Sequence, residues 1–175
     1  MSEVAETNLK EVGELKIAEQ EIKESGQNYL SEIKESLTSS YLGELKELSG
    51  KDIASTIEHI NVEDFAKKVE PLSTEEIKIG RAEFQSQKEA LIKDWESLNQ
   101  QTWPQYTHDV YDQKTGTLIR TEGSRYDAHH IQPLQLGGKN EASNLIPLSA
   151  ENHYDHRGVH EASSPLSQLN KLQES

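Results

Sequence analysis

Residues 126–160 read YDAHHIQPLQLGGKNEASNLIPLSAENHYDHRGVH, and this stretch holds five of the seven histidines in a chain of 175 residues. Histidine binds zinc and similar divalent metals, and its side chain exchanges protons near neutral pH. Histidines at such short intervals indicate chemistry rather than packing. We therefore take this stretch as the candidate site and as the part of the chain that decides the fold.

The pattern around the histidines predicts strand, loop, strand and helix, in that order. His129 to Leu134 forms a short apolar strand, Gly137 to Asn140 a loop rich in turn residues, and Asn144 to Leu148 a second strand. Ser149 is a suitable N-cap for a helix. That helix carries the remaining histidines of the stretch on its turns: His153, His156 and His160.

This order of elements suits a metal site that hydrolyses phosphodiesters. Two helix histidines and one strand histidine can converge on one ion, because positions three and four apart share a helix face. Adjacent residues on a strand face opposite ways, so His129 and His130 can have different roles. One binds the metal and the other deprotonates water. We expect a divalent cofactor, with zinc, nickel, magnesium and manganese as candidates.

Composition limits the class of protein. The chain has no cysteine, which excludes disulfides and thiolate metal sites, and its net charge is −13. No apolar run reaches the roughly 18 residues of a membrane span, and the acidic N-terminus does not resemble a cleavable signal. Because an acidic chain attracts nucleic acid poorly, binding would depend on the metal and a few cations. We expect a protein made in the cytoplasm and exported without a general secretory signal.

The chain changes character near residue 100. Residues 1–100 carry 22 acidic against 12 basic residues, and their apolar positions recur at helical intervals. We expect a helix that ends near Gly50, a shorter helical pair up to Val69, and a longer helix that begins at Ser73. Residues 101–175 contain short strand patterns, including a hairpin across Gly116. We predict an α+β protein with an acidic helical segment for delivery or interaction (1–100) and a catalytic domain (101–175).

The helix that begins at Ser73 has the clearest start signal. Ser73-Thr-Glu-Glu76 has the form of a capping box, in which each end residue satisfies the backbone N–H of the other. The helix then runs for about seven turns. Its apolar stripe repeats every seven residues, at Ile77, Phe84, Leu91 and Leu98. This stripe packs within the protein's own bundle, or it joins residues 73–100 to a helical partner or a second copy.

Four pieces of the chain, taken in order, resemble the HNH endonuclease superfamily. They are Tyr126-Asp-Ala-His-His, Pro133-Leu-Gln-Leu-Gly-Gly, Asn144-Leu-Ile-Pro-Leu and His156-Arg-Gly-Val-His. Within that superfamily the chain is most similar to the nuclease toxins of bacterial competition, which include the nuclease colicins. The resemblance extends from about Arg125 to Leu166 and implies a small ββα-metal nuclease domain.

The resemblance also implies roles for individual residues. His129 is expected to bind the metal, and His130 to be the general base. Asn144 would hydrogen-bond to backbone, which fixes the loop and the orientation of the base. The usual spacing of the helix ligands favours His156 and His160. His153, nine residues after Asn144, is the alternative for one of these two positions.

Three charged residues near the site have open roles. Arg125 and Arg157 either clamp the scissile phosphate or lie on the surface. Asp127 orients a histidine, pairs with an arginine, or is a surface residue.

The functional expectation from the resemblance is a metal-dependent endonuclease that cleaves DNA with little sequence specificity. It would be the toxic module of a bacterial antagonism system, delivered into target cells, with a cognate immunity protein as partner. The alternatives are cleavage of RNA, a restriction or phage nuclease, and an acidic helical interaction protein whose metal is structural.

Overall fold

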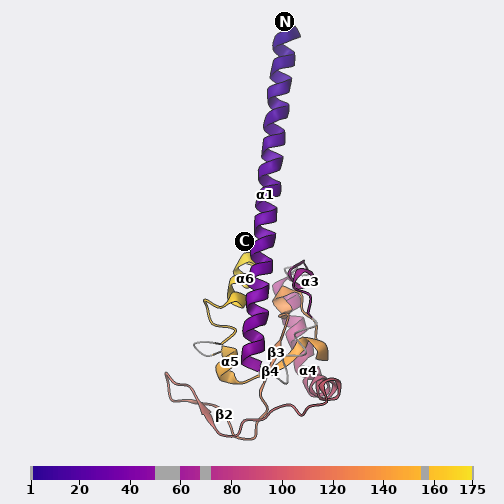
Figure 1. Ribbon diagram of the computed structural model, residues 1–175. Helices are drawn as coiled ribbons and strands as arrows, with labels where there is room; N and C mark the ends of the chain where they lie inside the picture. The colour runs from indigo at the N-terminus through magenta and orange to yellow at the C-terminus, as the bar shows by residue number, and fades with distance from the viewer. Residues whose placement is uncertain (1, 50–59, 68–71, 155–157, 175) are drawn as a thin grey trace. The chain divides into compact units, whose positions relative to one another are not determined.

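The computed structural model describes residues 2–49, 60–67, 72–154 and 158–174 (Figure 1). Contacts divide the chain into two compact units, Met1–Ser36 and Leu37–Ser175. The predicted α+β class is confirmed, because helices precede two small sheets of two strands each. No described helix is both long enough and apolar enough to cross a membrane.

The first helix, α1 (Ser2–Ser49), includes the predicted helix that ends near Gly50. The part in the first unit exposes its described side chains from residue 23 to residue 32. The part from Leu37 onward belongs to the second unit, where Tyr41 and Leu45 are fully buried in the core. The last three turns of α1 therefore belong to the same compact unit as the histidine segment.

The second helical region is described only in part. Helix α3 (Val62–Lys67) matches the second member of the predicted pair, and Phe65 on it joins the core beside Tyr41. The first member and His59 lie outside the described residues.

Helix α4 (Thr74–Asn99) begins with the predicted capping box. The Ser73 N–H donates to a Glu76 carboxylate oxygen at 2.8 Å, and the Glu76 N–H donates to Ser73 Oγ at 3.2 Å. These two bonds satisfy backbone donors that the first turn of a helix leaves unpaired.

The apolar stripe of α4 packs within the protein's own unit, although the seven-residue register is only partly right. The buried side chains are Phe84, Leu91, Ile92 and Trp95, whereas Leu98 is 61% exposed. A straight helix drifts by about 20° per heptad relative to an exact seven-residue repeat, so a stripe three heptads long leaves the buried face. The buried residues pack against Trp103 and Leu145.

Two antiparallel hairpins follow. Strands β1 (Val110–Tyr111) and β2 (Leu118–Arg120) form the predicted hairpin across Gly116. Strands β3 (Asp127–His130) and β4 (Leu145–Leu148) pair with His129 opposite Ile146 and His130 opposite Leu145. The first strand of this second hairpin was predicted to extend to Leu134, which is wrong.

The connection between β3 and β4 is compact. It contains the 3-10 turns η1 (Leu134–Leu136) and η2 (Ala142–Asn144). The Gln132 N–H donates to the Asn144 side chain rather than to backbone, and Pro133 has no N–H to donate, so the ladder ends shortly after His130. At Gly138 a Cβ atom would lie 1.6 Å from the Gln132 carbonyl oxygen, so the loop folds back on itself at a point where only glycine fits.

Two short helices complete the chain. Helix α5 (Ala150–Tyr154) packs against β3 and β4, and α6 (Pro165–Glu174) packs against η1. The prediction that one helix carries His160 is wrong. The Val159 and His160 N–H groups donate to the carbonyls of Asn152 and His153, seven residues earlier, which a continuous α-helix with its four-residue spacing does not allow. His160 instead lies in a turn.

Candidate metal centre

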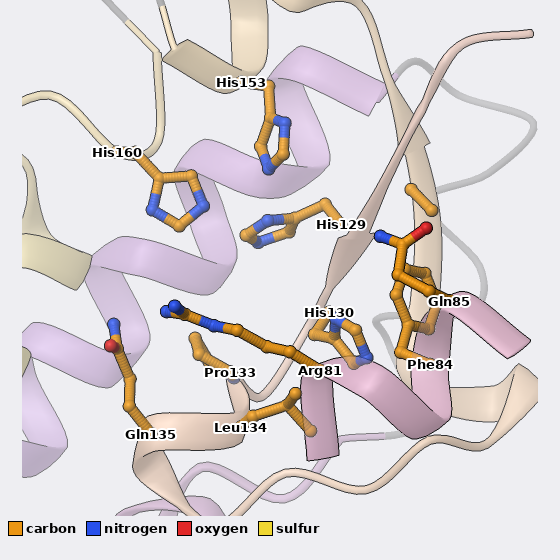
Figure 2. Close-up of a pocket in the computed structure, with 11 residues that line it drawn as sticks. Arg81, Phe84, Gln85, His129, His130, Pro133, Leu134, Gln135, His153 and His160 are labelled. Atoms are coloured by element: carbon orange, nitrogen blue, oxygen red, sulfur yellow. The ribbon is translucent and has the colours of Figure 1, made fainter. Parts of the chain in front are cut away.

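Three histidines from separate elements converge in the second unit (Figure 2). His129 is on β3, His153 is on α5 and His160 is in the following turn, and one ring nitrogen of each lies within 4.8 Å of the other two. Nitrogens bound to one tetrahedral ion at about 2.0–2.1 Å lie about 3.4 Å apart. Small side-chain rotations would therefore bring the three nitrogens to the spacing of metal ligands. The donor set and its spacing fit a divalent metal ion.

A carboxylate orients one of these histidines. Asp127 Oδ2 lies 3.3 Å from His153 Nδ1, and both oxygens of Asp127 accept hydrogen bonds from Arg120, at 2.8 and 2.7 Å. Tyr106 donates a further bond of 3.2 Å to Asp127. Because a carboxylate only accepts, Nδ1 of His153 carries the proton and the lone pair that can bind a metal is on Nε2. Asp127 thus orients a histidine and also pairs with an arginine.

The charge on this carboxylate is well stabilised. Burial alone would raise the pKa of Asp127, but the hydrogen bonds from His153 and Arg120 outweigh burial and hold the pKa far below its ordinary value. Asp127 is therefore ionised at neutral pH and remains an acceptor for the imidazole N–H.

Burial also keeps two of these histidines, His129 and His160, unprotonated. It lowers the pKa of His129, which is further lowered by the nearby His153, His160 and His130. Burial, followed by the proximity of His153, lowers the pKa of His160 to about 4. A neutral imidazole has the lone pair that a metal needs, so both rings are ready to bind an ion at neutral pH.

The fourth histidine is held differently. His130 Nε2 lies 2.9 Å from Asn140 Oδ1, and Asn140 Nδ2 donates to the Gly80 carbonyl of α4 at 2.9 Å. The Gly80 carbonyl oxygen only accepts, so the NH₂ of the Asn140 amide must face it. The Asn140 amide oxygen then faces His130, and Nε2 of His130 must carry the ring proton. The lone pair of the neutral ring is then on Nδ1. Burial, the largest effect, lowers the pKa of His130, although the hydrogen bond that the ring donates to Asn140 opposes this.

Asn144 ties the connecting loop to itself, as predicted. Its Oδ1 accepts from the Gln132 N–H at 2.8 Å, and its Nδ2 donates to the carbonyls of Gln132 and Lys139, both at 2.9 Å. The ring of His130 is held by Asn140 instead. Asn144 therefore acts on the histidine through the shape of the loop, and Asn140 is a site residue that sequence reasoning missed.

All four histidines line one cavity of about 270 Å³. Helix α4 contributes Arg81, Phe84 and Gln85 to its wall, and the Phe84 ring meets the His130 ring edge-on, with centroids 4.6 Å apart. Figure 2 shows Arg81 extending from α4 across the pocket toward His129 and His160. Sequence reasoning did not assign Arg81 to the site, because nothing in its local sequence distinguishes it from a surface arginine.

Of the two arginines predicted to clamp the phosphate, only Arg125 is among the described residues. Arg125 forms an ion pair with Glu89 of α4 at 2.8 Å and does not line this cavity. Arg157 and His156 lie outside the described residues, so their predicted roles stay predictions. Of the two helix ligands first favoured, the structure brings His160 to the cluster, and the alternative, His153, joins it.

A comparison with sequence models of known protein families gives no match. Among curated proteins, the chain is similar to Toxin YxiD of Bacillus subtilis (strain 168), with 40% identity over 91 residues. The matched region is 52% of this chain and 16% of the longer protein, so the chain spans only a small part of that relative.

Proposed function

We propose that this chain is the catalytic module of a bacterial nuclease toxin, a metal-dependent HNH-type endonuclease that hydrolyses phosphodiester bonds of DNA. The observation that carries the proposal is the convergence of three histidines, two of them buried, with a fourth histidine and Arg81 in the same cavity. The order of β3, β4 and α5 agrees with a ββα-metal site. The similarity to a protein named as a toxin supports the biological role.

The proposed metal ligands are His129, His153 and His160. A bound divalent ion would neutralise charge on the scissile phosphate and on the departing oxygen. Three imidazoles suit zinc and nickel, whereas magnesium and manganese prefer oxygen donors. Zinc or nickel is therefore the proposed ion.

The remaining residues have distinct proposed tasks. His130 Nδ1, which has the lone pair, takes a proton from the water that attacks phosphorus. Asn140 keeps that lone pair facing the cavity, because it occupies the opposite ring nitrogen. Arg81 binds a non-bridging phosphate oxygen, because its guanidinium reaches the same cavity and forms no ion pair with any described residue.

The substrate and biological setting follow from the same proposal. The net charge of −13 argues against an extended surface for base recognition, so cleavage of DNA would show little sequence preference. A toxin that reaches target cells endangers its producer, so a cognate immunity protein is the proposed partner. RNA is the alternative substrate.

The decisive experiment is cleavage of supercoiled plasmid by the purified chain, with EDTA or with added zinc, nickel, magnesium or manganese ions. We expect nicked and linear products with added metal and none with EDTA. A parallel reaction with structured RNA tests the other polymer. Folded, metal-loaded protein that cuts neither polymer would contradict the proposal and favour a structural metal.

The two arginines provide an internal comparison. Replacing Arg81 with glutamine should lower plasmid cleavage by about 10²-fold, because a charged donor to the phosphate is lost from the site. Replacing Arg125 with glutamine removes only an exposed ion pair with Glu89 and should change cleavage less than threefold. Initial nicking rates at fixed metal concentration measure both effects. Equal losses in the two variants would show that Arg81 has no special position.

A further inference from the structure

We infer that Tyr41, on the last turns of α1, is a positioning residue of the metal centre that selects which ring nitrogen of His129 faces the ion. This inference rests on the proposed metal site. Tyr41 precedes His129 by 88 residues and lies in the part of the chain that sequence patterns assigned to delivery or interaction.

Two short contacts define the geometry. The Tyr41 hydroxyl lies 2.6 Å from His129 Nε2 and 2.6 Å from the Ile131 carbonyl oxygen. Tyr41 is 0% exposed and His129 is 2% exposed, so water does not compete for these groups. The rings of Tyr41 and His129 also meet edge-on, with centroids 6.2 Å apart.

The proton count then fixes the tautomer. A tyrosine hydroxyl has one proton, and a carbonyl oxygen only accepts, so Tyr41 must donate to Ile131. Its oxygen is left to accept from His129, and Nε2 must therefore carry the ring proton. The lone pair of neutral His129 is on Nδ1, which is the atom available to a metal.

Such a contact also has an energetic role. A hydrogen bond to the second ring nitrogen orients a histidine ligand and raises its basicity, and losing it typically weakens metal affinity by about 10- to 100-fold. Asp127 has this role for His153. Tyr41 does the same for His129 from an element that precedes the predicted catalytic domain, so a fragment that starts at residue 101 would lack one of the two orienting contacts.

The test is zinc binding to the full chain, measured by competition with a chromophoric chelator. Tyr41→Phe should weaken zinc affinity by about 10- to 100-fold while circular dichroism shows a retained fold. Tyr126→Phe removes a hydroxyl for which the structure shows no hydrogen bond to a described residue and should leave affinity unchanged. Leu42→Ala, in the same core, measures any loss of affinity caused by loosened packing alone.

A second measurement does not depend on the metal. Long-range ¹H–¹⁵N NMR of the metal-free protein reports the tautomer of each histidine. We expect His129 to be protonated at Nε2 in the wild type and to become a mixture in Tyr41→Phe. Unchanged affinity and an unchanged tautomer in Tyr41→Phe would overturn the inference. Failure of the wild type to bind zinc would instead overturn the proposed function, and the NMR result would still decide the role of Tyr41.

Discussion

Replacing His130 with alanine is expected to lower plasmid cleavage by about 10²- to 10⁴-fold while metal affinity stays within a few-fold of the wild type. A general base contributes a factor of this size to catalysis. The ring of His130 contacts Asn140 and Phe84, and it is not among the three histidines whose nitrogens converge. Single-turnover nicking rates and zinc titrations on the same preparations measure the two quantities separately.

The control for this variant must retain the packing against Phe84. His130→Gln keeps most of the side-chain volume and should be as inactive as alanine, because an amide does not take a proton at neutral pH. His108→Ala changes an exposed histidine and should be as active as the wild type. Substantial activity in His130→Gln would contradict the assignment of His130 as the base, even if metal-dependent cleavage is present.

Local signals predicted the fold wherever one segment determines its own structure. The capping box at Ser73 and the hairpin across Gly116 formed as expected, because turn and cap chemistry depends on residues only a few positions apart. The sequence could not show that α1 continues into the second unit, since amphipathic spacing does not say what a helix packs against. The position of His160 also escaped prediction, because a turn takes it out of the helix.

The site residues also divide into those that local sequence indicates and those that only tertiary contacts bring together. The four histidines and Asn144 could be named from sequence, since their spacing follows from short strands and one loop. Asn140 orients the His130 ring because its own amide donates to Gly80, which is 60 residues away, and Tyr41 is 88 residues from its histidine. Tertiary contacts of this kind leave no local pattern. Tyr41 and Asn140 were therefore visible only in three dimensions, whereas Asp127, two residues before His129, was already a candidate for orienting a histidine.

Removing one proposed ligand should abolish tight metal binding. His153→Ala leaves two imidazoles, so zinc affinity should fall by at least about 100-fold, since a structural or catalytic zinc site normally has three or more protein ligands. An ion that binds only the folded state at 100 times its dissociation constant stabilises it by about 2.7 kcal/mol. We therefore expect zinc to raise the melting temperature of the wild type but not that of His153→Ala, as measured by thermal unfolding with and without zinc.

His108→Ala again provides the matched control, because it also removes one imidazole but from an exposed loop, and its zinc-induced stabilisation should equal that of the wild type. Asp127→Asn refines the test. It keeps an acceptor near His153 but weakens the pairing with Arg120, so its zinc affinity should fall between the wild type and His153→Ala. If His153→Ala keeps the full stabilisation by zinc, the ion binds elsewhere, and His156, outside the described residues, becomes the ligand to test. An intermediate affinity for Asp127→Asn would show that the carboxylate acts through the histidine it orients rather than as a ligand itself.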